Sequence, residues 1–266
     1  MKLIADAGST KTKWVYVDEE GKTLNEVHTV GINAMQVTEE ELKEILSALQ
    51  FDGVNAIRFY GAGCVGGEVN EKIKKALSRC ATCDDIEVHS DIVGAAVGTL
   101  GSKRGIVCIL GTGSNSALWN GKEVAEKRNA GGYILGDEGS GAVIGRQLMS
   151  DYIKGLTPDW LTEILRDEYK LDYATTVQRV YREAMPNRWL ASFAKLLGEH
   201  MDEPYVKRLI ETQFQGFILR NIAQYAEWQE MDCAFVGSIA FYFQGILREV
   251  CKEMGVRVRI IKKEPF

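Results

Sequence analysis

The sequence has 266 residues, and 32 Lys and Arg against 37 Asp and Glu give a formal net charge of −5. Hydrophobic residues make up 45% and charged residues 26%, which is typical of a globular chain and excludes a disordered or collagen-like one. The basic residues are spread along the chain instead of forming a stripe, so nucleic acid is not an expected partner.

The start of the chain does not read as an export signal. Its apolar run is short and is interrupted by Asp6, and no stretch approaches the roughly 18 apolar residues of a membrane-spanning helix. We therefore expect a cytoplasmic protein with no membrane partner. Its six cysteines are then expected to be reduced thiols rather than a disulfide framework.

Residues 1–104 are expected to alternate between strands and helices. Apolar and β-branched runs predict the strands, and apolar residues at helical spacing predict the helices. Thr38 followed by Glu41 is the pattern of a capping box, which marks a helix start. The expected strands are 2–6, 13–17, 23–30, 56–60 and 86–88, and the expected helices are 38–49, 69–77 and 91–100.

The pattern starts again at Gly105. A strand, a glycine turn and a second strand lead to Asn120-Gly121, a dipeptide typical of tight hairpins. Helices are expected to dominate from Gly139 onward. The remaining expected elements are strands at 106–110, 116–119, 233–236 and 256–261, and a helix at 241–254.

A shift of 105 positions aligns the two glycine turns. Gly8 then falls on Gly113 and Ser9 on Ser114, and a strand with a tryptophan follows each turn. The repeat indicates duplicated α/β domains, although two unrelated hairpins would explain it equally well. The duplicated domains would span 1–104 and 105–266.

Both glycine turns are candidate phosphate sites. A tight turn after a buried strand presents successive backbone N–H groups, and such a concavity binds phosphate. The segments are Asp6–Thr12 and Gly111–Asn115, which could hold the β- and γ-phosphates of ATP from both sides. Neither is a P-loop or a dinucleotide fingerprint. Asp6, at a strand end, is a candidate Mg²⁺ ligand. Ordinary polar hairpins are the alternative interpretation.

Three further segments carry candidate functional residues. Asp91, at a predicted helix start, is either an N-cap or a general base that takes the proton of an attacking sugar hydroxyl. The glycine-rich stretch 129–141 surrounds Asp137 and suits a loop wrapped on a sugar, unless Asp137 only favours a helix N-terminus. Gly237, between a strand and a helix, either lets adenine approach the backbone or forms a tight turn.

These pieces in this order resemble the N-acetylglucosamine kinase branch of the BadF/BadG-type ATPase family, within the actin/hexokinase superfamily, over nearly the whole chain. The most specific match is Gly-Gly-Tyr-Ile-Leu-Gly-Asp-Glu-Gly-Ser at 131–140, which resembles the sugar-binding segment of that branch. The sequence Ile-Leu-Gly-Thr-Gly-Ser-Asn at 109–115 resembles its second phosphate motif.

The resemblance implies two ribonuclease-H-like domains of the actin-like ATPase fold around a central cleft. It implies ATP and Mg²⁺ as cofactors, an amino sugar as substrate, and transfer of phosphate to the 6-hydroxyl of N-acetylglucosamine. Asp91 would be the base and Asp6 the metal residue. The ATP site would include Gly8, Ser9, Thr10, Lys11, Thr112, Gly113, Ser114, Gly237 and Ser238, and the sugar site Asn33, Asn129 and Asp137.

The chain departs from that family in two places. Its first turn lacks the run of glycines found in many relatives, and it stops at Phe266, where relatives continue with a short helix, which would fit a truncated chain. Two other function classes are weighed. An iron–sulfur activator of a dehydratase needs more thiolates than the pair Cys80 and Cys83, and a non-catalytic regulator would not need Asp91. The sequence leaves a monomer and a homodimer both open.

Overall fold

The computed structural model describes residues 1–266. The chain divides into two compact units, one made of residues 1–98 with 264–266 and the other of residues 99–263. The expected boundary after residue 104 differs by six residues from this division, and the last three residues belong to the first unit instead of the second. Below, each unit is described by itself.

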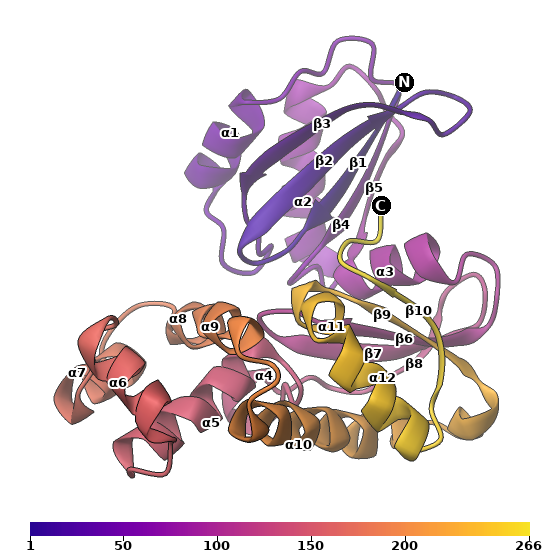
Figure 1. Ribbon diagram of the computed structural model, residues 1–266. Helices are drawn as coiled ribbons and strands as arrows, with labels where there is room; N and C mark the ends of the chain where they lie inside the picture. Colours follow the sequence, from indigo (N-terminus) through magenta and orange to yellow (C-terminus); the bar gives the residue numbers. More distant parts are fainter. The chain divides into compact units, whose positions relative to one another are not determined.

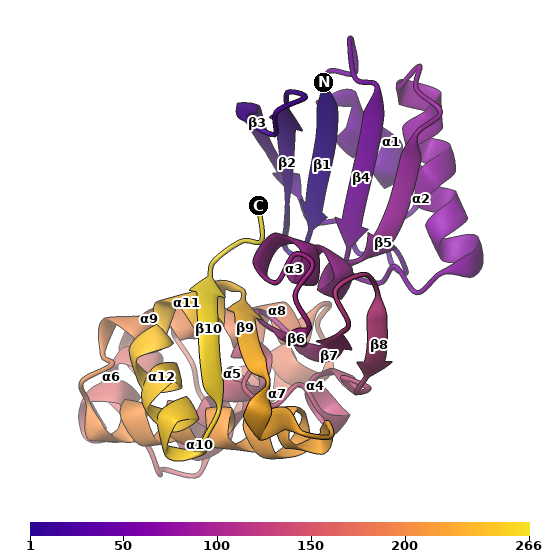
Figure 2. The same ribbon diagram turned by 90° about the vertical axis from the view of Figure 1, so that its right-hand side faces the viewer.

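The first unit is built on a five-stranded sheet in the order β3-β2-β1-β4-β5 (Figure 2). β1 pairs with β2, and β2 with β3, in antiparallel fashion, whereas β1, β4 and β5 run parallel. Alternate residues of β1 are fully buried, which explains the short apolar run at the start of the chain. The strands are β1 (Lys2–Ala7), β2 (Lys11–Val17), β3 (Thr23–Val30), β4 (Ala56–Gly61) and β5 (Ile86–Ser90).

Two helices cover one face of this sheet, and a third follows β5. The expected capping box is confirmed, because the Thr38 side chain accepts a hydrogen bond from the Glu41 amide and the Glu41 carboxylate accepts one from the Thr38 amide. Apolar residues of the first two helices pack on Trp14 and Phe59 of the sheet. The helices are α1 (Glu39–Ser47), α2 (Gly67–Cys80) and α3 (Asp91–Thr99).

The sheet of the second unit has the order β10-β9-β6-β7-β8. β6 pairs antiparallel with β7, and β7 with β8, while β6, β9 and β10 run parallel. Order and directions therefore repeat those of the first sheet, as the duplicated turns predict. The strands are β6 (Gly105–Leu110), β7 (Ser114–Trp119), β8 (Val124–Lys127), β9 (Asp232–Val236) and β10 (Arg257–Lys262).

The second unit carries most of the helices (Figure 1). They are α4 (Gly132–Leu135), α5 (Gly141–Ile153), α6 (Asp159–Asp167), α7 (Tyr173–Tyr181), α8 (Pro186–Ser192), α9 (Ala194–Glu199), α10 (Pro204–Arg220), the 3₁₀ helices Ile222–Gln224 and Trp228–Glu230, α11 (Ser238–Tyr242) and α12 (Gln244–Glu253). The expected helix at 241–254 is instead two helices that meet at Phe243, whose side chain is buried in the core. β8 and α4 were not predicted from the sequence.

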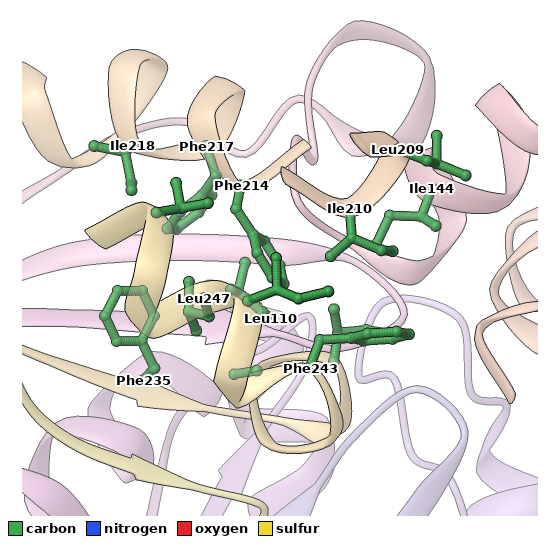
Figure 3. Packing of buried hydrophobic residues seen from close by; sticks show 14 of the residues in the cluster. Leu110, Ile144, Leu209, Ile210, Phe214, Phe217, Ile218, Phe235, Phe243 and Leu247 are labelled. Carbon is green, nitrogen blue, oxygen red and sulfur yellow. The ribbon is translucent and has the colours of Figure 1, made fainter. Parts of the chain in front are cut away.

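The core of the second unit lies between its sheet and the helices α5, α10 and α12. Figure 3 shows Phe214 and Phe217 of α10 beside Leu110 of β6 and Leu247 of α12, all fully buried. Leu110 is the last residue of the strand that leads into the second glycine turn, so the turn begins from a fixed position. No helix is both long enough and apolar enough to cross a membrane.

Candidate functional site

Two acidic side chains lie at the carboxyl edge of the parallel strands in the first unit. Asp6 is the next-to-last residue of β1, and Asp91 directly follows β5. β4 lies between these strands, with Tyr60 paired to Asp6 on one side and to His89 on the other. The carboxylates of Asp6 and Asp91 are close enough to interact electrostatically. Such strand ends are where open α/β sheets bind ligands.

Asp6 is partly buried and sits among charges. Burial, followed by the negative charges of Asp91 and Glu264, raises the pKa of Asp6 to about 7. Lys11 and Lys13 act in the opposite direction. No group of three or more His, Cys, Asp or Glu forms a metal cage, but Mg²⁺ commonly uses one or two carboxylates together with water and phosphates. A single carboxylate with neighbouring negative charge fits that kind of binding.

Asp91 begins α3, and the backbone amide of Ile92 donates a hydrogen bond of 2.8 Å to its Oδ1. The helix N-terminus favours a negative charge at this position. Gly94, one turn further, lies against β4, since a Cβ there would come within 2.6 Å of the Tyr60 Cβ. This close packing explains the small residues behind Asp91 and fixes where its carboxylate lies. This position of the Asp91 carboxylate is compatible with a role as helix cap and with a role as general base.

The first glycine turn connects β1 and β2. The amide of Gly8 donates to the carbonyl of Lys11 at 3.0 Å, which closes the turn. Gly31, after β3, packs directly on it: a Cβ at Gly31 would lie 2.4 Å from the Ser9 carbonyl carbon. The Asn33 Nδ2 donates to the Ser9 Oγ at 3.3 Å. Asn33, expected to contact the sugar, is thus brought to the phosphate turn of the same unit.

Lys11 does not project freely from this turn, because its ammonium group is bound to the carboxylate of Glu264. The same carboxylate lies 3.4 Å from the Nζ of Lys13, which also pairs with Glu26 at 3.0 Å. The carbonyl of Phe266 accepts a further hydrogen bond from Lys13 at 3.2 Å. The ammonium groups of Lys11 and Lys13, at the first turn, are therefore both bound by residues of the segment after β10.

The second glycine turn connects β6 and β7 and is tied to the start of α5. The amide of Gly111 donates to the Gly113 carbonyl at 2.9 Å. The amides of Gly141 and Ala142 donate to the carbonyls of Gly111 and Thr112 at 2.8 and 3.1 Å. Gly111 and Thr112 are therefore held from outside the turn, with their carbonyl groups directed toward the start of α5.

Asp137 lies against this turn. The backbone amide of Ser114 donates a hydrogen bond to its carboxylate, and a Cβ at Gly113 would lie 2.9 Å from the Asp137 Oδ2. Burial raises the pKa of Asp137 to about 6, the Ser114 hydrogen bond lowers it, and the charge of Glu138 raises it. The structure thus joins a predicted sugar residue to the predicted phosphate residues Gly113 and Ser114.

Three further predicted site residues of this unit, Asn129, Gly237 and Ser238, lie in or directly after the loops that follow β8 and β9. Asn129 is exposed, just after β8, and the amide of Asp137 donates to the neighbouring Ala130 carbonyl at 3.0 Å. Gly237 has φ 121°, and a Cβ there would lie 2.3 Å from the Leu110 carbonyl oxygen. Gly237 is therefore required for close packing on the second turn, and Ser238, exposed at the start of α11, follows it.

Two contributions to the site were missed by the sequence reasoning. Glu264 lies 253 residues from Lys11, and no local pattern connects them. Glu138 pairs with Arg220 of α10, 2.7 Å from its Oε1 to the Arg220 Nε, and so ties the 137–141 segment to that helix. The opposite charges are the only signal in the sequence, and they do not identify a partner.

Comparison with known proteins identifies the family of this chain. The family model of the BadF/BadG/BcrA/BcrD ATPases matches residues 5–158, which is more than half of the chain. The N-acetylmuramic acid/N-acetylglucosamine kinase of Clostridium acetobutylicum is 28% identical over 209 residues, which cover 73% of this chain and 68% of that protein.

Solved structures show the same fold over the whole chain. A crystal structure from Porphyromonas gingivalis, provisionally named N-acetylglucosamine kinase, has a TM-score of 0.92 and 39% identity, and the match covers 100% of this chain and 95% of that one. A ROK family glucokinase from Streptomyces griseus, at 14% identity, shares the fold with a TM-score of 0.62 over 99% of this chain and 94% of its own. The fold is thus that of the actin-like sugar kinases, and the chain belongs to the BadF/BadG/BcrA/BcrD ATPase family.

Proposed function

We propose that the protein is an ATP-dependent kinase of amino sugars, with N-acetylglucosamine as substrate and its 6-hydroxyl as acceptor. Family membership and the similarity to kinases named for N-acetylglucosamine support this class of reaction. The observation that carries the proposal is the pairing, in each unit, of a glycine turn with a side chain suited to a sugar. Asn33 is bonded to Ser9, and Asp137 to Ser114.

ATP would bind through the backbone amides and hydroxyl groups of the two turns. Peptide N–H groups in tight turns are suited to phosphate oxygens, and both turns follow buried strands that fix their position. Asp6 would hold Mg²⁺, which, when bound, neutralises charge on the phosphates during transfer. Gly237 and Ser238 would lie on the adenosine side. Because the reaction consumes ATP, we place the enzyme in the cytoplasm.

Asp91 would act as the general base. As the sugar oxygen forms its bond to the γ-phosphorus, the hydroxyl proton passes to the Asp91 carboxylate, and the bond to the β-phosphate oxygen breaks to release ADP. The start of α3 would favour negative charge on this carboxylate, as a proton acceptor requires. The neighbouring Asp6 carboxylate would serve Mg²⁺ instead, so two acids a short distance apart take different roles.

Sugar selection would depend on polar groups that can pair with hydroxyls and with the acetamido group. Asn33 and Asn129 offer both donors and acceptors, whereas Asp137 offers acceptors when ionised. A site built to bind a particular polar group discriminates strongly against analogues that lack it, since its own polar atoms are then left unpaired. We therefore expect N-acetylglucosamine to be preferred over glucose, which lacks the acetamido group.

The test is a coupled assay of ADP release with Mg²⁺ over a panel of sugars: N-acetylglucosamine, N-acetylmuramic acid, glucosamine, N-acetylmannosamine and glucose. The expected result is stimulation by N-acetylglucosamine, with a weaker response or none for glucose. Asp91→Asn serves as the matched control for contaminating kinases, because it should lose the stimulated rate. Absence of stimulation by every amino sugar in the panel would contradict the proposed function.

A further inference from the structure

The strand β8 leaves its neighbour β7 just before a predicted sugar residue. The ladder between the two strands ends at the pair Ala117 and Lys127, and Asn129 follows shortly after with an exposed side chain. The amide of Arg128, the first residue beyond the ladder, donates to the hydroxyl of Tyr225 at 3.3 Å, 97 residues further along the chain. The backbone therefore enters Asn129 from a residue that is bound by a distant side chain.

Tyr225 is itself fixed in the core of the second unit. Its side chain is buried in the hydrophobic cluster, and its hydroxyl oxygen lies 2.8 Å from the Oγ of Ser116, which is fully buried on β7. The phenol can donate its one hydrogen to Ser116 while its oxygen accepts from the Arg128 amide, so the two bonds coexist. Tyr225 therefore offers that amide an acceptor at a defined position.

The side chain of Arg128 returns to the same segment. Its guanidinium carbon lies 5.1 Å from the centre of the Tyr225 ring, within the range of a cation–π interaction. Its Nη2 donates to the Gln224 carbonyl at 2.5 Å and is also bound to the Glu126 carboxylate. Arg128 is thus held twice by Tyr225, at its backbone through the hydroxyl and at its side chain through the ring.

The residue after Asn129 is fixed as well. The carbonyl of Ala130 accepts a hydrogen bond from the Asp137 amide at 3.0 Å, and a Cβ at Gly136 would lie 1.9 Å from the same carbonyl oxygen. Asn129 therefore lies between two anchored residues while its own side chain is exposed. Anchors on both sides limit the directions that this side chain can take, and such preorganisation lowers the entropic cost of binding a ligand.

We propose that Tyr225 is a positioning residue for the sugar site: through the Arg128 amide, its hydroxyl fixes the backbone from which Asn129 reaches the sugar. Tyr225 is too deeply buried to contact a ligand itself. The inference rests on the proposed function, because it takes Asn129 as a sugar contact. Loss of the hydroxyl should then weaken sugar binding and leave ATP binding and the transfer step unchanged.

The test compares Tyr225→Phe with Ser116→Ala. Tyr225→Phe keeps the ring beside the Arg128 guanidinium and removes only the hydroxyl. Ser116→Ala is the matched control, because it breaks the same buried bond between the two hydroxyls but leaves the phenol oxygen to accept from Arg128. Steady-state kinetics give kcat and the KM values for N-acetylglucosamine and ATP. Hydrogen exchange of the Arg128 amide, followed by NMR without ligand, reports on the bond directly and should show protection in the wild type.

Tyr225→Phe should raise the KM for N-acetylglucosamine by about 3- to 10-fold, the range that corresponds to one hydrogen bond between neutral groups, with faster exchange at the Arg128 amide. Its kcat and its KM for ATP, and all values for Ser116→Ala, should stay close to those of the wild type. Added to Asn129→Ala, Tyr225→Phe should raise the KM for sugar no further, since the positioned contact is already gone.

An unchanged KM for sugar in Tyr225→Phe would overturn the inference while the proposed function stands. Equal rises in Tyr225→Phe and Ser116→Ala would also overturn it, because they would indicate a general loosening of the core. An Arg128 amide that exchanges without protection in the wild type would show that the anchor does not exist. A wild type that phosphorylates no amino sugar is a different result: it contradicts the proposed function and, with it, the role of Tyr225 in sugar binding.

Discussion

The two units share one sheet topology but hold their glycine turns in different ways. In the first unit the turn is crowded by Gly31, its lysine is bound to Glu264, and two acids lie close by. In the second unit the turn is tied by backbone hydrogen bonds to the start of α5 and by the carboxylate of Asp137. The comparison shows that the first turn is surrounded by charged side chains, whereas the second turn is held by backbone hydrogen bonds.

The largest effect should come from a change at Asp91, the proposed general base of the first unit. Asp91→Asn keeps a hydrogen-bonding group of the same size but cannot accept a proton, so kcat should fall by roughly 10²–10⁴-fold with little change in sugar affinity. Steady-state kinetics measure both. Near-normal turnover would mean that Asp91 is only a helix cap and that the first unit does not supply the base.

The pH dependence of stability should differ between the units. Asp6 and Asp137 have folded-state pKa values of about 7 and about 6, raised first of all by burial from 3.8. The folded state therefore binds the proton more tightly, and the stability that this contributes is present below about pH 4 and is lost as the pH rises through the folded pKa.

Replacing either acid by Asn removes that loss. As the pH rises above about 4, the free energy of unfolding of Asp137→Asn should increase relative to that of the wild type and level off at about pH 6. For Asp6→Asn the increase should continue to about pH 7. For Asp137 the gain should be smaller than the roughly 3 kcal/mol that about 1.4 kcal/mol per unit of pKa would give, since solvent screens this partly exposed carboxylate. Urea unfolding between pH 4 and 8 measures both variants. Differences from the wild type that do not change with pH would contradict these pKa shifts.

Alanine at the turn glycines should separate the crowded turn from the open one. Gly31→Ala places a Cβ 2.4 Å from the Ser9 backbone, whereas Gly111→Ala meets nothing within 4 Å. Overpacking of this kind costs roughly 1–3 kcal/mol, so the unfolding midpoint should fall in Gly31→Ala and stay near that of the wild type in Gly111→Ala. Equal midpoints for the two variants would show that the first turn is not crowded.

The smallest expected effect concerns the ion pair on the first turn. Glu264→Gln frees Lys11 for phosphate, and the KM for ATP should fall by about 2–5-fold, in line with the small worth of partly exposed ion pairs. Glu26→Gln is the matched control, because it removes a partner of Lys13 and leaves Lys11 bound to Glu264. A KM for ATP that rises in Glu264→Gln would mean that the pair supports the turn instead of competing with phosphate.

Much of the fold follows from local patterns. The β-branched run of β2, the capping box at Thr38 and the restart at Gly105 each depend on neighbouring residues, and each was found in the structure where the sequence places it. The break at Phe243, where φ is −99° and ψ is 23°, was not predicted, because apolar spacing continues through it.

The site was less accessible to sequence reasoning. Glycine turns and acids at strand ends have a local signature, and so Asp6, Asp91 and Asp137 could be named. The partner that sets each one's chemistry cannot be read locally: Glu264 reaches Lys11 from the far end of the chain, and Asp137 meets Ser114 only through the return of the chain after β8.

The central claim is phosphate transfer from ATP to the 6-hydroxyl of N-acetylglucosamine, and the most direct measurement identifies the product. Purified protein is incubated with Mg²⁺, ATP and N-acetylglucosamine, and the sugar is then analysed by mass spectrometry and by phosphorus and proton NMR. The account predicts one added phosphoryl group, with phosphorus coupled to the protons on carbon 6, and no such product with Asp91→Asn. Unmodified sugar after complete incubation, or phosphate on a different oxygen, would contradict it.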